Sequence, residues 1–333
     1  MSGRLELAVE GRKSVEGWAA GAQVLALLST IHELGWTRYL AEPRELAELA
    51  AYSGLPPTRV SDLVAVLAEY GVVVDDNGRV RLSSQYEAFA ADDAWIGLGE
   101  ILDRSAVMSK LIDTAVREPG PLPLSEDDAL VIARASGGRA TAETRRLFEQ
   151  VFLPQLPELA DLVRRERWLD VGCGVAGSSL TLATLFPEMR SVAVELVPTV
   201  AAEALRRAEA QGVADRVEIR CLDIRELKET DEFGGAFWAQ PFFPESTRAE
   251  TLAVIRRAIK PGGLLFLQET EPEPQPSGGL AYAVRRLVTR GWDVPFGRTA
   301  EQLAAEAETA GFDLVRLAVT DVGRYVVAQR PGR

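Results

Sequence analysis

The sequence predicts an α/β protein in which a mainly helical N-terminal region precedes a doubly wound, mostly parallel sheet. From Trp168 onward, short apolar runs alternate with helical patterns, which is typical of parallel strands joined by crossover helices. The last two runs are separated only by 321–324, so we expect an antiparallel hairpin at the end of the sheet. The seven expected strands are Trp168–Val171, Ser191–Glu195, Val217–Cys221, Ala236–Ala239, Leu264–Gln268, Leu314–Thr320 and Tyr325–Gln329.

The chain begins with a helical pattern. Apolar residues recur at helical spacing from Val24 to Leu34, and Gly35 is expected to end this helix. The apolar run from Trp18 to Ile31 is too short to cross a membrane, and acidic residues precede it where a signal peptide needs positive charge. We therefore interpret it as a buried or dimer-forming helix.

A helix-turn-helix outline follows. It consists of a helix at Leu46–Tyr52, a turn at 53–57, and a helix at Arg59–Tyr70 for which Thr58 is the expected N-cap. Strands at 72–74 and 79–82, joined by a turn that contains Asn-Gly, then predict a hairpin. Together these elements predict a winged helix within residues 1–90.

Charge argues against DNA binding by this region. Residues 1–90 hold eight Lys/Arg and twelve Asp/Glu, and the whole chain carries a formal charge of -12. Phosphate contacts need clustered positive charge, so we expect neither a nucleic-acid nor a membrane partner and interpret the winged helix as a dimerisation domain. The two cysteines, Cys173 and Cys221, lack the paired spacing of a metal site or a disulfide framework, which favours a reducing, cytoplasmic location.

A glycine-rich turn follows the first strand of the sheet. Gly172, Gly174 and Gly177 form a Gly-x-Gly-x-x-Gly pattern between a strand and a helix, where glycines allow a sharp turn and the helix presents free N–H groups. This pattern alone fits several nucleotide cofactors, or merely a tight turn.

Three further features narrow the choice among these nucleotide cofactors. Glu195 ends the second strand, 18 residues after Gly177, where a carboxylate can accept hydrogen bonds from ribose hydroxyls. Asp223 follows the third strand, placed to meet an adenine amino group, with Ile224 beside it as an apolar face. A turn at 261–263, Pro-Gly-Gly, leads into the fifth strand.

Residues 148–329 resemble the class I S-adenosylmethionine-dependent methyltransferases. That family shows Asp-x-Gly-x-Gly, an acidic residue after strand two, an aspartate after strand three and Pro-Gly-Gly before strand five, and all four features occur here in that order, starting at Asp170. The resemblance implies a Rossmann-like methyltransferase sheet and S-adenosylmethionine as the cofactor. The implied cofactor-binding residues are Asp170, Gly172, Gly174, Gly177, Glu195, Asp223, Ile224 and Trp238.

The N-terminal part extends the resemblance to small-molecule O-methyltransferases of specialised metabolism. Those enzymes often carry a winged-helix dimerisation domain ahead of the catalytic one, which implies a homodimer. We expect a dimerisation domain at 1–90, a helical connector at 91–147 that contributes to the substrate pocket, and a catalytic domain at 148–333.

The chain departs from that subfamily at the usual catalytic histidine. The stretch from Phe237 to Pro244 contains no histidine, and the only histidine of the chain is His32. Methyl transfer is an in-line displacement that depends mainly on alignment and exclusion of water. The acceptor atom therefore remains open among nitrogen, carbon and oxygen.

Two side chains are candidates for catalysis. Gln240 begins a Gln-Pro-Phe-Phe stretch that is similar to the (Asn/Asp)-Pro-Pro-(Tyr/Phe) loop of amino methyltransferases. Glu269 ends strand five on the ligand side of the sheet and is a better candidate for a base than Glu245. The alternative for Glu269 is a solvated acid.

We expect a small, apolar or aromatic acceptor and no metal. Its pocket is expected to be walled by aromatic side chains, although each of them is also a candidate for ordinary core packing. The competing hypothesis is a protein that binds S-adenosylmethionine without methylating, either as a cofactor-sensing winged-helix regulator or as an enzyme that uses the sulfonium only as a charge. The expected wall residues are Trp95, Phe242, Phe243, Tyr282 and Trp292.

Overall fold

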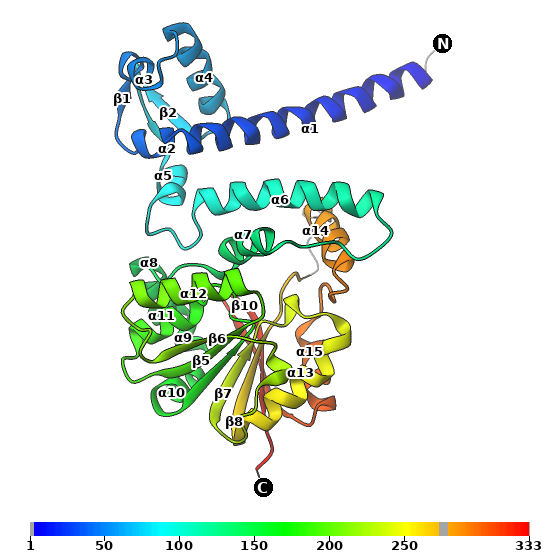
Figure 1. The fold of residues 1–333 in the computed structure, drawn as a ribbon. Coiled ribbons are helices and arrows are strands. Elements are labelled where there is room, and N and C mark those ends of the chain that lie inside the picture. The colour runs from blue at the N-terminus through cyan, green and yellow to red at the C-terminus, as the bar shows by residue number, and fades with distance from the viewer. Residues whose placement is uncertain (1–2, 273–278, 333) are drawn as a thin grey trace. The chain divides into compact units, whose positions relative to one another are not determined.

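The computed structural model describes residues 3–272 and 279–332, and the chain divides into two compact units, Met1–Asp103 and Arg104–Arg333. Figure 1 shows the course of the chain through both units. Within the described ranges, no helix is both long enough and apolar enough to cross a membrane.

The first unit combines helices with a three-stranded sheet. Its core is apolar and includes Leu28, Ile31 and Trp36, whereas the N-terminal two-thirds of the first helix exposes its apolar side chains, among them Trp18. The first helix stops just before Gly35, whose φ of 81° favours glycine, as the sequence predicts. The elements are α1 (Gly3–Glu33), α2 (Trp36–Tyr39), β1 (Arg44–Glu45), α3 (Leu46–Ser53), α4 (Pro57–Glu69), β2 (Val73–Asp76), β3 (Arg79–Leu82), α5 (Ser84–Ala90) and the start of α6 (Leu98–Arg117).

Local geometry confirms the hairpin and corrects one helix start. Asn77 and Gly78 both have positive φ, and strands β2 and β3 pair antiparallel around them. The prediction of Thr58 as an N-cap was wrong, because α4 already begins at Pro57. Proline lacks an N–H and has its φ fixed near the helical value, so it starts a helix without a capping side chain. The short strand β1, which pairs with β3, was not predicted.

The second unit is built on a seven-stranded sheet with the order β6-β5-β4-β7-β8-β10-β9. The first five strands are parallel, and the last two form the predicted antiparallel hairpin, with the later strand paired to β8. This confirms the predicted doubly wound α/β fold. The strands are β4 (Arg167–Val171), β5 (Arg190–Glu195), β6 (Val217–Cys221), β7 (Phe233–Trp238), β8 (Ile259–Gln268), β9 (Asp313–Thr320) and β10 (Gly323–Gln329).

Two strands begin at least three residues earlier than predicted. Strand β7 starts at Phe233 and includes Gly235, where a Cβ would lie 3.0 Å from the side chains of Leu162 and Trp168. A glycine there lets the neighbouring helix approach the sheet closely, but it hides the strand from an apolar-run search. Strand β8 includes the Pro-Gly-Gly segment, and its pairing with β7 shifts register between Phe233 and Gly235.

Helices cover both faces of this sheet (Figure 1). Helices α10, α11 and α12 bury apolar residues in one core cluster with the sheet, and α13 and α15 do so in a second cluster. The helices and short helical turns are α7 (Glu126–Gly137), α8 (Ala142–Leu147), η1 (Phe148–Phe152), α9 (Leu153–Gln155), α10 (Pro157–Arg165), α11 (Gly177–Leu185), α12 (Pro198–Ala210), η2 (Ile224–Glu226), η3 (Gln240–Phe242), α13 (Glu245–Ala258), α14 (Gly279–Gly291) and α15 (Ala300–Thr309).

A third apolar cluster of this unit lies outside the sheet. It joins Leu111 of α6 to Val288 of α14, with Val131 and Ile132 of α7 and Trp292 packed against it. Helices α6, α7 and α14 therefore form a small helical group with a core of its own.

Candidate functional site

The glycine turn lies at the carboxyl ends of β4 and β5. Gly172 and Cys173 both donate their backbone N–H to the carbonyl of Val194, at 2.9 and 3.0 Å. Gly172, Gly174 and Ala176 all have positive φ, so the chain reverses sharply before α11 begins at Gly177. The free N–H groups at the start of this helix consequently face the edge of the sheet where ligands bind in doubly wound folds.

The three glycines are required for different reasons. A Cβ on Gly172 would lie 2.7 Å from the ring of Phe243, and a Cβ on Gly177 would lie 2.0 Å from the carbonyl oxygen of Gly137. A Cβ on Gly174 would meet nothing within 4 Å. The turn is thus packed by protein at its two ends and open in the middle, where a ligand can approach the backbone.

The Glu195 carboxylate bridges this turn and the next helix. One oxygen accepts the N–H of Gly174 at 3.0 Å, and the other accepts the N–H of Val197 at 2.9 Å. These bonds fix the side chain at the mouth of the turn. Each carboxylate oxygen has a second lone pair, so the group can still accept hydrogen bonds from a diol.

Asp170 lies beneath the turn, at the end of β4. Its side chain is buried and accepts a 2.6 Å hydrogen bond from the hydroxyl of Ser179 in α11. Burial raises its pKa to about 6, and the nearby Glu195 adds to the rise, although the Ser179 bond opposes it. Burial also raises the pKa of the Cys173 thiol. The buried Asp170 carboxylate therefore ties the end of β4 to α11 next to the glycine turn.

Asp223 is held by its own neighbour, Arg225. The guanidinium contacts both carboxylate oxygens, with the shortest distance 2.7 Å, and the backbone N–H of Arg225 donates to the same group. These hydrogen bonds lower the pKa of Asp223. Ile224 is buried in the core, while Leu196, directly after Glu195, is 62% exposed. Leu196 was missed, although an apolar residue after the acidic one is visible in the sequence.

The loop after β7 is locked by a buried arginine. Arg248 of α13, 1% exposed, donates to the backbone carbonyl of Gln240 at 2.8 Å and to its amide oxygen at 3.2 Å. Glu306 of α15 accepts two hydrogen bonds from the same guanidinium, at 2.7 and 2.6 Å. The sequence did not predict the pairing of Arg248 with Glu306, because 58 residues separate them.

The Gln240 side chain is buried and hydrogen-bonded within the same network. Its Nε2 donates to the carbonyl of Gln268 at 3.3 Å, and the residue is only 2% exposed. The candidate catalytic amide therefore serves as an internal tie between two strand ends. In this arrangement it presents no surface to an acceptor.

The aromatic residues of this loop differ in exposure. Trp238 is fully buried between the guanidinium of Arg248 and the edge-packed ring of Phe243, so it offers no surface to a cofactor. Phe243 packs against the glycine turn at Gly172. Phe242 is 55% exposed and is the aromatic residue of the loop that is free to meet an acceptor.

Both candidate acids are engaged in ion pairs. The Glu269 carboxylate lies 3.1 Å from Arg324 of β10, and its side chain is 7% exposed. Glu245 pairs with Arg298 at 2.6 Å. Each of these carboxylates is therefore already partnered by a guanidinium in this structure.

The residues of the expected aromatic wall lie in different packing environments. Trp95 belongs to the first unit and is 51% exposed. In the second unit, Tyr282 packs edge-on against Phe296, whereas Trp292 joins the helical group of α6, α7 and α14. His32, in the first unit, lies 2.9 Å from the hydroxyl of Thr37 and has a structural contact there.

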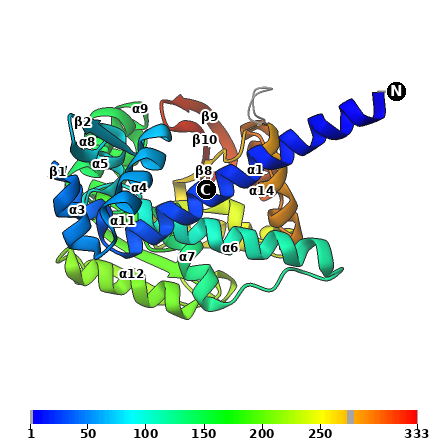
Figure 2. The ribbon, with the colours of Figure 1, turned by 90° about the horizontal axis from the view of Figure 1, so that it is seen from above.

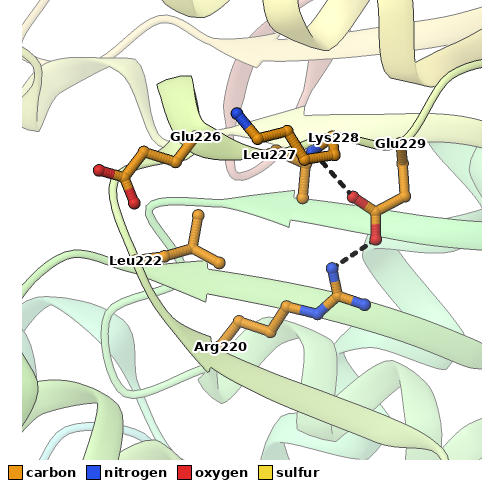
Figure 3. Close-up of a pocket in the computed structure, with 6 residues that line it drawn as sticks. All are labelled: Arg220, Leu222, Glu226, Leu227, Lys228 and Glu229. Atoms are coloured by element: carbon orange, nitrogen blue, oxygen red, sulfur yellow. Dashed lines mark hydrogen bonds and ion pairs between the residues drawn. The ribbon is translucent and has the colours of Figure 1, made fainter.

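A shallow hollow lies beside the edge strand β6 (Figure 3). An ion pair between Arg220 and Glu229, 2.5 Å long, crosses it, and Leu222 contributes an apolar wall. The glycine turn and Glu195 are not among its lining residues. Among the described residues, no group of three His, Cys, Asp or Glu side chains is arranged to hold a metal ion.

Sequence comparison matches the region that contains this site. Residues 169–263 match a family described as a methyltransferase domain, a segment that includes the glycine turn, Glu195 and Asp223. The bacteriochlorophyllide d C-20 methyltransferase of Chlorobaculum tepidum is 25% identical over 269 residues, covering 73% of this chain and 74% of that protein. The chain therefore contains a methyltransferase domain, and its cofactor is S-adenosylmethionine.

Solved structures of methyltransferases share the whole fold. Human N-acetylserotonin methyltransferase, in complex with S-adenosylmethionine, is 16% identical with a TM-score of 0.72, covering 97% of this chain and 98% of its own. The N,N-8-amino-8-demethyl-D-riboflavin dimethyltransferase of Streptomyces davawensis is 20% identical with a TM-score of 0.64, covering 97% of this chain and 99% of its own. The methyltransferase therefore shares its N-terminal region, as well as its sheet, with these proteins.

Proposed function

We propose that this methyltransferase transfers the methyl group of S-adenosylmethionine to a carbon or nitrogen atom of a small, apolar or aromatic metabolite. The observation that carries the proposal is the loop after β7. It contains no histidine, and its one polar side chain, Gln240, is buried and bonded to Arg248. Such a loop favours acceptors that are nucleophilic without help from a strong protein base.

The cofactor roles follow the geometry of the turn. Glu195 would accept hydrogen bonds from the ribose hydroxyls, and Asp223 would accept one from the adenine amino group. Exposed Leu196 would cover one face of the adenine, and Ile224 would support it from the core. Gly174 provides the open backbone at which the methionine part can approach. Gly172, Gly177 and Asp170 would shape the turn from its packed sides rather than touch the cofactor.

The reaction itself requires alignment. The acceptor atom forms its bond to the methyl carbon while the carbon–sulfur bond breaks, and the electron pair of that bond stays on sulfur as S-adenosylhomocysteine is formed. A proton lost from a carbon or nitrogen acceptor passes to water. Exposed Phe242 is placed to orient an apolar acceptor. The names of similar proteins include a C-20 methyltransferase, an N,N-dimethyltransferase and O-methyltransferases, so the choice of carbon or nitrogen rests on the loop after β7.

We further propose that the first unit is a winged-helix dimerisation domain and that the working enzyme is a cytoplasmic homodimer of specialised metabolism. The exposed apolar side chains of α1, including Leu7, Val15 and Trp18, support this assignment, because a helix that buries only its last turns leaves apolar surface for a second copy. The connector, 91–147, would then contribute the helical group that contains Trp292 to the acceptor pocket.

Isothermal titration tests the cofactor site. We expect Glu195→Gln to weaken S-adenosylhomocysteine binding by about tenfold or more, because an amide forms weaker hydrogen bonds to hydroxyls than a carboxylate does. Glu209→Gln, an exposed change on α12, is the matched control and should bind like the wild type. Equal affinity of the two variants would contradict the role of Glu195.

Methyl-labelled cofactor tests the transfer step. Incubation with panels of aromatic amines, phenols and electron-rich carbon acceptors should place label in amine or carbon products. Label confined to phenol oxygen would overturn the acceptor assignment. Tight cofactor binding with no transfer to any class would favour the cofactor-sensing alternative.

A further inference from the structure

The end of α7 is pressed against the beginning of α11. A Cβ on Gly177 would lie 2.0 Å from the carbonyl oxygen of Gly137 and 2.7 Å from that of Gly138. In return, a Cβ on Gly137 would lie 2.6 Å from the side chain of Val175 within the glycine turn. Residues 137–138, here called the strap, therefore form a backbone-to-backbone contact with the turn that holds the cofactor.

A buried ionic cluster on α12 holds the strap in place. Arg207, 13% exposed, donates to the carbonyl of Gly138 at 2.8 Å and to the carboxylate of Glu203 at 2.9 Å. Arg134 of α7 lies 3.3 Å from the same carboxylate. Burial alone would raise the pKa of Glu203, but the hydrogen bonds from Arg206, Arg207 and Arg134 lower it to about 2, so the group stays charged.

Helix α7 is also tied to α12 at its other end and to the helical group. The hydroxyl of Thr199 donates to the carbonyl of Glu126 at 3.2 Å, and Figures 1 and 2 show the two helices side by side. In the same helix, Val131 and Ile132 pack on the apolar cluster next to Trp292. Helix α7 thus contacts both the proposed acceptor wall and the glycine turn.

We propose that Arg207 is a positioning residue for cofactor binding: by joining Glu203 to the Gly138 carbonyl, it holds the strap against the first turn of α11. The role rests on the proposed cofactor site, since its benefit is a preorganised glycine turn. Because the strap is the end of α7, it also links the helical group to the glycine turn.

The test compares Arg207→Met with Arg206→Met. Both arginines bond to Glu203, but only Arg207 reaches the strap, and Arg206 is 64% exposed. In the free protein, hydrogen exchange of amides 175–182 should be about fivefold faster in Arg207→Met and unchanged in Arg206→Met. Titration with S-adenosylhomocysteine should show about tenfold weaker binding for Arg207→Met only.

Several outcomes decide the proposal. If both variants fold and match each other in exchange and in affinity, Arg207 has no positioning role. If Arg207→Met does not fold, Arg207→Lys is used instead, because a lysine ammonium cannot hydrogen-bond to Glu203 and to the Gly138 carbonyl with the geometry of a guanidinium. Wild-type hydrogen exchange and wild-type affinity in Arg207→Lys would overturn the proposal. A wild-type protein that binds no S-adenosylhomocysteine would refute the proposed function, while the exchange comparison, which needs no ligand, would still test the strap.

Discussion

At the scale of single residues, the site depends on charged groups that the fold buries next to specific partners. Asp170 and Arg248 are 4% and 1% exposed, and each is bonded to a side chain on a different element. Burial of a charge is costly unless partners compensate, so each residue makes a measurable contribution to stability.

The stability of the protein should depend on pH through Asp170. Its pKa is raised from 3.8 to about 6, so its protonated form favours the folded state; this contribution is complete below pH 3.8 and is lost as the pH rises through 6. Between pH 5 and pH 8, we expect Asp170→Asn to gain about 1.4 kcal/mol of stability relative to the wild type, since at pH 5 about half of the total effect is already lost. Urea unfolding at both pH values measures the difference.

The control for that experiment is Asp161→Asn, because Asp161 is exposed on α10. Its unfolding free energy should follow the wild type at both pH values. A pH profile of Asp170→Asn that parallels the wild type would show that Asp170 is not the group that titrates.

Removal of the buried guanidinium should destabilise the loop after β7. Arg248→Met leaves Glu306 as a partly buried charge with Arg298 beside it, 3.1 Å away, and we expect a loss of about 3 kcal/mol in unfolding free energy. The double variant Arg248→Met/Glu306→Leu should recover part of this loss, since it removes the uncompensated charge. Additive losses in denaturant titration would contradict the coupling.

At the scale of elements, the sequence predicted what local patterns encode. The glycine turn, the last hairpin and the turn at Asn77-Gly78 follow from glycine chemistry and apolar runs, and the structure has all three. Strand β7 begins before the apolar run that predicted it, because Gly235, which makes room for Leu162, interrupts the apolar pattern within the strand. Contacts between distant segments were not foreseeable, because the strap, the Arg248 network and the burial of Trp238 depend on tertiary packing alone.

Two glycine substitutions should act on the elements of the first unit with opposite signs. Gly78 has φ +87°, so Gly78→Ala strains the β2–β3 turn and should cost about 1 kcal/mol. Gly11 lies in exposed α1 with nothing within 4 Å of its Cβ position, so Gly11→Ala should stabilise the helix by about 0.5–1 kcal/mol. Circular dichroism during denaturant titration measures both, and shifts of the same sign would contradict the assignment.

At the scale of the whole molecule, the chain combines an acidic surface with an apolar α1. The formal charge of -12 keeps copies apart through most of their surface, so association should depend on the apolar side chains of α1. The division into two compact units at Asp103 assigns these side chains to a unit separate from the glycine turn.

We expect the wild type to be a dimer and Trp18→Glu to be a monomer at micromolar concentration, because Trp18 is 68% exposed on α1 and a charge there opposes burial. Light scattering after size-exclusion chromatography gives the mass of each. Val319→Glu, on exposed β9, introduces the same charge elsewhere and should stay dimeric. A monomeric wild type would refute the dimer.

The strand order has a consequence for how the chain acquires its fold. Strand β10 is later in the sequence than β8 and β9, yet it lies between them. During synthesis, β9 has no place in the sheet until β10 has emerged, so the nascent chain passes through a state in which β8 is an unpaired edge. An exposed edge is a template for pairing with other chains. Until the last hairpin is in place, the open edge of β8 is therefore a site at which the growing protein can pair with other chains.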